Sequence, residues 1–216
     1  MAKSIIIDMN HPAVQYLCQK DRRLAKVIKM VEPISYVPYD ECAYSFLVHE
    51  IIEQMLSVKA GQKIYQRLED LCNGNVTPEK VNVLSDNEIR CTGTSSSKAR
   101  CIRDVTDAVL CGKLDFDKMH MLSDEEVMQH LIKYHGIGKW TVKMFLIFVL
   151  ERPDILPIED GAFLQVYRWM YKTKDCSEKD VTAKCKKWKP FSSIGSRFCY
   201  RALDSGLTRE DFHLFK

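Results

Sequence analysis

Two glycines, Gly136 and Gly138, lie between two segments of helical periodicity, and this arrangement constrains the fold more than any other feature of the chain. The first segment opens at Ser123 with the Ser-x-x-Glu form of a capping box and continues into an apolar run, which predicts a short helix ending near Tyr134. The second has apolar residues at spacings of three and four and ends before a proline, which disfavours helical geometry in the residue before it. The sequence therefore predicts a helix-hairpin-helix over residues 123–150.

This hairpin has the chemistry of a phosphate-binding loop. Glycine permits positive φ and close backbone approach, and the amides at the N-terminus of the second helix carry partial positive charge. We expect the backbone of Gly136, Ile137 and Gly138 to hold a DNA phosphate, with added contacts from Lys139 and Thr141. A plain turn between two helices is the alternative, because a Gly-x-Gly pattern alone does not distinguish the two.

An acidic residue, Asp160, follows Pro157 at the start of the next apolar run. A carboxylate beside an anomeric carbon stabilises the positive charge that develops as a glycosidic bond breaks, and it can orient or deprotonate the attacking water. Aspartate is also a common helix cap, and the two roles can coexist, since helix N-terminal amides stabilise negative charge. Asp160 is the candidate catalytic residue, with Glu159 as the alternative.

Hairpin and acid together resemble those of the helix-hairpin-helix DNA glycosylases, in particular the DNA-3-methyladenine glycosylase II branch, which acts on alkylated purines. Further segments similar to that family occur in the same order at residues 46–57, 93–99 and 188–193, followed by Tyr200. The resemblance covers most of the chain from about Asp21 onward. It implies double-stranded DNA containing damaged bases as the partner, base removal as the activity and Asp160 as the catalytic carboxylate.

The chain departs from the family pattern in two places. The best-known members carry an extra N-terminal β-rich domain, for which these 216 residues leave no room. The Trp-x-Pro element beginning at Trp188 usually continues with an arginine, where this chain has Ser192. We expect the first departure to remove little chemistry and the second to alter a contact near the C-terminus.

A glycosylase must take the base out of the stack and fill the gap with a side chain. The resemblance places the DNA-inserting loop at Gln54, Met55 and Ser57, with Met55 in the position of the wedge residue. Its flexible apolar side chain suits that role. The residue pattern alone is equally compatible with Met55 as ordinary helix core.

An aromatic ring face attracts a cation, so Trp140 and Tyr200 are candidates for holding a base made cationic by alkylation. Where the family pocket carries another aromatic residue, this chain has Met144, which predicts a different substrate preference. Either ring is also compatible with core packing. His49 is more typical of a hydrogen-bonded structural histidine than of a pocket donor.

Bifunctional relatives form a Schiff base through a lysine two residues after the second hairpin glycine, and this chain has Trp140 there. Without that amine, strand cleavage by β-elimination loses its usual nucleophile, which predicts a monofunctional glycosylase. Lys139 and Lys143 lie nearby, but phosphate binding or solvation is the more typical role for each.

Helix signals recur along the chain, including Thr77-Pro78 and capping-box patterns at Ser85 and Thr208. Strand signals are nearly confined to residues 5–7 and 81–84. We expect an all-α protein, a single glycosylase unit over residues 1–216. Its two helical lobes, residues 40–150 and residues 1–39 plus 151–216, should flank a DNA-binding cleft.

The amino-acid composition says less about function than these motifs do. A net charge of +3 is only mildly basic, and the two lysine- and arginine-rich stretches are equally compatible with solvated helix faces. Nine scattered cysteines lack metal-type spacing, so we expect reduced thiols and no iron–sulfur cluster. We expect no other cofactor, apart from a monovalent cation at the hairpin–phosphate contact. With no signal peptide or membrane-length apolar run, a soluble protein is expected in the cytoplasm or, in a bacterium, on the nucleoid. We also expect a monomer.

Two other functions fit parts of the pattern. A glycosylase for deaminated or oxidised bases would use the same hairpin and acid. A non-catalytic helix-hairpin-helix module would use the hairpin alone, and Asp160 argues against it, because an acid near phosphate weakens binding.

Overall fold

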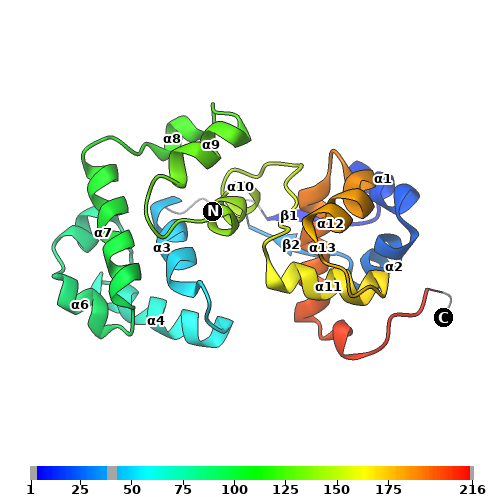
Figure 1. Cartoon of the computed structure of the whole chain (residues 1–216), viewed down its shortest axis with the longest axis horizontal. Coiled ribbons are helices and arrows are strands. Elements are labelled where there is room, and N and C mark those ends of the chain that lie inside the picture. Colours follow the sequence, from blue (N-terminus) through cyan, green and yellow to red (C-terminus); the bar gives the residue numbers. More distant parts are fainter. Residues whose placement is uncertain (1–3, 38–42, 215–216) are drawn as a thin grey trace. The chain divides into compact units, whose positions relative to one another are not determined.

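The structure is a computed structural model that describes residues 4–37 and 43–214. It is 63% helical, which confirms the all-α prediction, and its described strands form one antiparallel pair (Figure 1). The chain divides into two compact units, and their bounds differ by one residue from the expected lobes. We call Tyr39–Leu150 the central unit and Met1–Pro38 together with Glu151–Lys216 the terminal unit.

The central unit is built on two apolar helices, α3 and α10, most of whose residues are buried. Helices with buried faces of their own pack around them. In chain order the helices of this unit are α3 (Ala43–Glu53), α4 (Val58–Leu71), α5 (Pro78–Asn82), α6 (Asp86–Cys91), α7 (Ser96–Leu110), α8 (Phe116–Met119), α9 (Asp124–Leu131) and α10 (Lys139–Phe148).

The terminal unit joins the two ends of the chain around one core. Trp188 is fully buried there and meets Phe163 edge to face, with ring centroids 6.1 Å apart. The predicted strand at residues 5–7 is present and pairs with one that the sequence did not reveal. The elements are β1 (Ile5–Ile7), α1 (Pro12–Lys20), α2 (Arg22–Val31), β2 (Ile34–Tyr36), α11 (Gly161–Tyr171), α12 (Glu178–Cys185), η1 (Lys186–Trp188), α13 (Ser192–Asp204) and η2 (Leu207–Arg209).

A buried carboxylate, Asp21, ties this core together. One of its oxygens caps α2 by accepting from two backbone amides, and the other accepts from the Tyr171 hydroxyl, from Trp188 Nε1 at 2.8 Å and from Lys187 Nζ at 3.2 Å. Every contact is a donor aimed at an oxygen, which suits an ionised carboxylate. Asp21 thereby links α2, α11 and η1.

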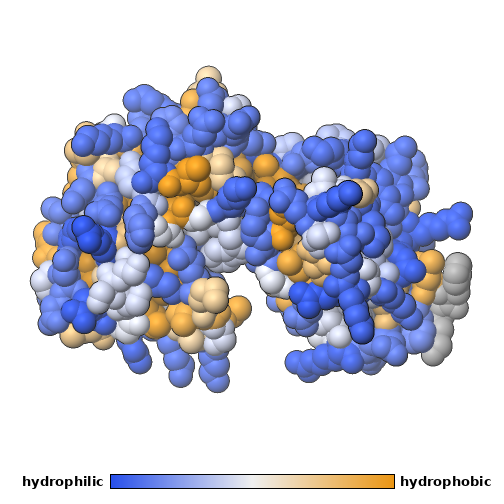
Figure 2. Space-filling view, in the orientation of Figure 1, coloured by the Kyte–Doolittle hydropathy of each residue, from blue (hydrophilic) through white to orange (hydrophobic). Residues whose placement is uncertain are grey.

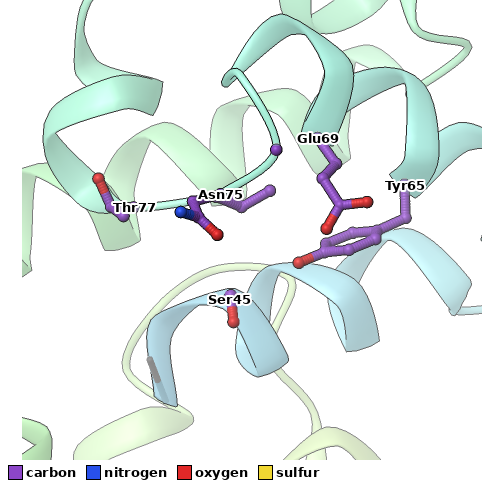
Figure 3. A pocket seen from close by; sticks show the side chains of 7 residues that line it. Ser45, Tyr65, Glu69, Asn75 and Thr77 are labelled. Carbon is purple, nitrogen blue, oxygen red and sulfur yellow. The ribbon is translucent and has the colours of Figure 1, made fainter. Parts of the chain in front are cut away.

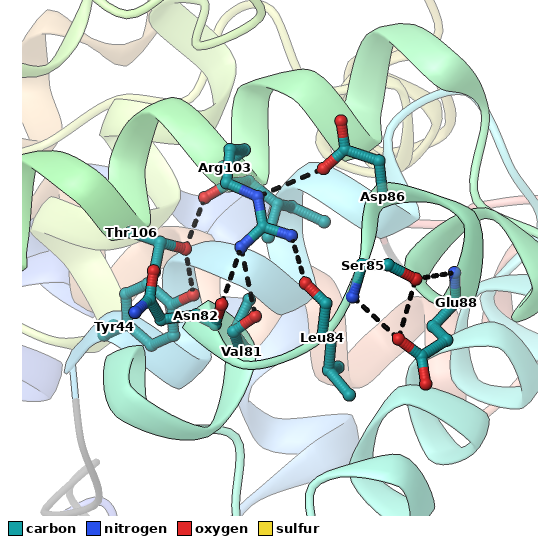
Figure 4. A network of polar contacts seen from close by, with 10 residues as sticks. Tyr44, Val81, Asn82, Leu84, Ser85, Asp86, Glu88, Arg103 and Thr106 are labelled. Atoms are coloured by element: carbon teal, nitrogen blue, oxygen red, sulfur yellow. Dashed lines mark hydrogen bonds and ion pairs between the residues drawn. The ribbon is translucent and has the colours of Figure 1, made fainter.

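Two local predictions were wrong. Residues 81–84 do not form a strand, because Thr77 caps a short helix, α5, that includes Val81 and Asn82. Arg103 of α7 donates to the carbonyl oxygens of Val81, Asn82 and Leu84, and its Nη1 lies 3.2 Å from that of Val81 (Figure 4). The capping box at Thr208 is also absent, since Gly206 at φ +74° starts a 3-10 turn that ends at Arg209. The capping boxes at Ser85 and Ser123 are confirmed.

The cysteines in the described segments are all free thiols. Over the same segments, no helix combines the length and apolar character needed to cross a bilayer. Hydrophilic side chains predominate on the visible surfaces of both units (Figure 2).

Candidate DNA-binding and catalytic residues

The hairpin joins α9 to α10 in the central unit, as predicted. Gly136 has φ +102°, and a Cβ added there would lie 3.0 Å from the Sγ of Cys101. Any larger residue would therefore meet both backbone strain and a packed sulfur. This turn requires glycine at its first position.

The second glycine leaves the start of α10 open. Gly138 precedes the helix and has no side chain with which to cap it, while Gly138 and Lys139 are exposed. Ile137 between the glycines is 5% exposed and anchors the turn in the core. An exposed, uncapped helix N-terminus next to a lysine has the geometry and charge to bind an anion.

Gln54 locks this hairpin to the end of α3. Its Nε2 donates to the carbonyl oxygen of Gly136 at 2.8 Å and to Oγ1 of Thr141 at 2.9 Å. Thr141 is 1% exposed. Both side chains thus hold the hairpin from inside, and a DNA contact from either remains a prediction.

Met55 projects from the loop that follows α3. It is fully exposed and has φ +59°, a left-handed conformation uncommon outside glycine. The alternative of Met55 as helix core is therefore wrong. Ser57, also exposed, accepts a hydrogen bond from the backbone amide of Ala60 and so caps α4.

Asp160 lies in the terminal unit as the N-cap of α11. Its Oδ1 accepts from the backbone amide of Phe163 at 2.6 Å, and the residue is 7% exposed. Amide and helix dipole both stabilise negative charge on this side chain. Its neighbour Glu159 is exposed. The predicted cap is confirmed, and the acid is held by backbone geometry.

The loop before Asp160 is tied to α13 by a pair of serines. Ser193 Oγ donates to the carbonyl oxygen of Arg152 at 2.6 Å and accepts from the amide of Ile155 at 2.9 Å. Ser192 Oγ donates to Asp154 at 2.5 Å. Where the family usually has arginine, this chain therefore uses a serine to fix the loop that leads to the acid. In the sequence, the Ser-Ser pair that opens this helix is the signal that indicates these contacts.

Of the three candidate pocket residues, Trp140 and Met144 belong to the central unit and Tyr200 to the terminal unit. Trp140 is half-buried on α10 of the central unit, where Met144 is 4% exposed, and Tyr200 is half-buried on α13 of the terminal unit. Both aromatic residues thus keep part of their surface accessible. Their contact with a base remains a prediction.

His49 is a paired structural histidine, in line with the sequence interpretation. Its nitrogens lie 3.6 Å from Glu50 and 3.4 Å from Glu53, and its ring meets Tyr65 edge to face. Burial alone would lower the pKa of His49, but the neighbouring carboxylates outweigh it and raise that pKa above its ordinary value. The side chains of His49, Glu50 and Glu53 offer ligand atoms within 4.8 Å of one another, and we assign no metal to them.

A polar pocket of about 260 Å³ is lined in part by Tyr65, whose ring also contacts His49. Figure 3 shows this pocket. Ser45, Tyr65, Glu69, Asn75 and Thr77 contribute polar groups to it. The residues proposed for DNA binding, the base pocket and catalysis do not line it. We therefore do not assign it to the base.

Comparisons with known proteins identify the family of the chain. Residues 48–191 match the model of the HhH-GPD superfamily of base excision DNA repair proteins, and the chain belongs to that superfamily. It is 29% identical over 154 residues to DNA-3-methyladenine glycosylase 1 of Schizosaccharomyces pombe, covering 70% of this chain and 67% of the relative.

Two solved structures are similar over nearly the whole chain. A DNA-3-methyladenine glycosidase from Bacillus halodurans has a TM-score of 0.83 at 30% identity, covering 97% of both chains. A 3-methyladenine DNA glycosylase of Schizosaccharomyces pombe in complex with abasic DNA has a TM-score of 0.79 at 26% identity, covering 90% of this chain and 97% of that one.

Proposed function

We propose that the protein is a monofunctional DNA glycosylase that everts alkylated purines of the 3-methyladenine and 7-methylguanine type and hydrolyses their N-glycosidic bond. The observation that carries the proposal is Asp160, a mostly buried carboxylate fixed at a helix N-terminus in a chain of the HhH-GPD superfamily. Its relatives named for 3-methyladenine, and the abasic DNA bound to one of them, support both substrate class and partner.

Each candidate residue has a defined task in this reaction. The amides at Gly138 and Lys139 bind a phosphate of the damaged strand, and Met55 enters the stack as the nucleotide is everted. The bond between C1′ and the base breaks with its electron pair leaving on the base. Asp160 stabilises the resulting positive charge on the sugar and takes a proton from the water that adds to C1′.

An alkylated purine is already cationic, so it leaves as a neutral base and needs no general acid. This fits a site with one candidate carboxylate. Hydrolysis requires only water, so the reaction proceeds without a metal or organic cofactor, and a monovalent cation at the hairpin would assist phosphate binding only. We expect the protein to act as a monomer.

The test is a base-release assay over duplexes that each carry one lesion: 3-methyladenine, 7-methylguanine, hypoxanthine or 8-oxoguanine. We expect release of the two alkylated bases in excess over the other two. Preferential release of hypoxanthine or 8-oxoguanine would instead support the alternative substrate class, for which Met144 in place of an aromatic residue is the motivating observation. No release from any duplex would favour a non-catalytic DNA-binding module.

The absence of lyase activity is a separate expectation. Trp140 occupies the position of the Schiff-base lysine, so strands should remain intact after base release and break only on alkaline treatment. Borohydride added during the reaction should trap no covalent protein–DNA adduct. A trapped adduct that disappears in Lys139→Gln or Lys143→Gln would assign the amine and contradict monofunctional chemistry.

Replacing Trp140 by alanine should slow the excision of cationic bases more than the excision of neutral bases. A ring face over a cation contributes roughly 0.5–2 kcal/mol, so Trp140→Ala should slow excision of 7-methylguanine about tenfold more than excision of hypoxanthine. Single-turnover rates on matched duplexes measure this ratio, and Tyr134→Ala on the hairpin's approach is the control. Equal losses on both substrates would show that Trp140 acts through packing alone.

A further inference from the structure

The loop that carries Met55 is held in a conformation that its own sequence does not favour. Met55 has φ +59°, and a residue with a Cβ pays a steric cost in this left-handed region, where helices usually end on glycine. Its side chain is fully exposed, so contacts of that side chain within the protein do not repay the cost. Contacts from another part of the protein must therefore hold the backbone of Met55 in this conformation.

Lys98, from the first turns of α7, supplies that restraint. Its Nζ donates to the carbonyl oxygen of Ile52 at 2.8 Å and to that of Gln54 at 2.6 Å. Carbonyl groups at a helix C-terminus lack partners within the helix and carry partial negative charge, which an ammonium group matches. Lys98 thus fixes the carbonyls of Ile52 and Gln54, the second of which immediately precedes Met55.

The same loop is fixed from a second side. Gln54, whose carbonyl oxygen Lys98 holds, uses its side chain to bind the carbonyl oxygen of Gly136 and the hydroxyl of Thr141. One residue therefore connects Lys98, the Met55 loop and the phosphate-binding hairpin. All of these contacts lie within the central unit.

We propose that Lys98 is a positioning residue for base eversion, which holds the Met55 loop at a fixed place relative to the hairpin so that the methionine enters the stack as the phosphate is bound. This inference rests on the proposed glycosylase function. Lys98 has no part in bond cleavage. Its effect should therefore appear where a base must be drawn out of a duplex and vanish where the base is already unstacked.

The experiment compares single-turnover release of 7-methylguanine from a duplex with release from the same oligonucleotide as a single strand. We expect Lys98→Met to lower the duplex-to-single-strand rate ratio by about tenfold, because misplacement by an ångström at a reacting complex costs one to two orders of magnitude. Lys98→Arg keeps the charge and the donors and should restore most of the ratio. Arg100→Met removes a charge from an exposed position on the same helix and should leave the ratio unchanged.

Thermal unfolding must show that each variant is folded at the assay temperature. If Lys98→Met is not folded, Lys98→Gln takes its place and must pass the same test. An equal fall in both rates, or an equal change in Arg100→Met, would overturn the positioning role while leaving the glycosylase function intact. If the wild-type protein released no base from either substrate, both proposals would be overturned.

Discussion

Asp160→Asn should abolish base release while leaving DNA binding intact. Asparagine is as good a helix cap as aspartate, so the hydrogen bond to the Phe163 amide and the start of α11 should survive. The substitution removes the negative charge that faces the developing sugar cation and the base that accepts the proton from water. We expect the single-turnover rate on a 7-methylguanine duplex to fall by about a thousandfold or more.

The exposed neighbour provides a matched control for this variant. Glu159→Gln removes one negative charge at the adjacent position and should change the rate by only about twofold, because an exposed charge is screened by solvent. Duplex affinity, measured by fluorescence anisotropy, should be equal or slightly higher in both variants, since each loses a repulsion toward phosphate. Undiminished release by Asp160→Asn, or loss of release in Glu159→Gln alone, would remove Asp160 from the mechanism.

The largest expected effect on stability is at Asp21. An asparagine there offers one oxygen where the carboxylate offers two. In either orientation its amide group would face donors, which are backbone amides on one side and Tyr171, Trp188 and Lys187 on the other. We expect Asp21→Asn to reduce the free energy of unfolding by about 3 kcal/mol, measured by urea titration. Asp8→Asn, at a turn aspartate in the same unit, should cost less than about 0.5 kcal/mol.

The pH dependence of stability gives an independent measure of the same group. Burial alone would raise the pKa of Asp21, but hydrogen bonds from Tyr171 and Trp188 and the charge of Lys187 lower it below its ordinary value of 3.8. A carboxyl whose pKa is depressed by folding contributes stability above its unfolded pKa and loses it as the pH falls through the folded pKa. As the pH falls below about 4, the free energy of unfolding of the wild-type protein should therefore decrease more than that of Asp21→Asn. Parallel curves would show that folding does not lower the pKa of Asp21.

Local sequence patterns predicted the structure correctly where several of them occurred close together. The Ser123 capping box, the two glycines and the spaced apolar residues after them predicted the hairpin and both of its helices, because each depends on neighbours within a few residues. Asp160 as a cap followed from the same logic. The Val81 segment was misread as a strand because an apolar run this short does not distinguish a strand from a helix.

Tertiary partners were the part that local patterns could not reveal. Arg103 lies about twenty residues from the carbonyls it binds at the end of α5, and nothing in the intervening sequence marks the pairing. The contacts of Lys98 and Gln54 are of the same kind, since both depend on how α7 and α10 pack against α3. The sequence placed both residues in family-like segments but could not assign what they hold.

We claim that the carboxylate of Asp160 faces positive charge at the anomeric centre of an everted nucleotide. The decisive measurement compares the affinities for two duplexes that differ at one abasic site, a cationic pyrrolidine in one and a neutral tetrahydrofuran in the other. The wild-type protein should bind the cationic duplex about tenfold or more tightly at equal salt, as an enzyme binds a transition-state analogue, and Asp160→Asn should lose that preference. Equal affinity of the wild-type protein for the two duplexes, or an undiminished preference in Asp160→Asn, would contradict the claim.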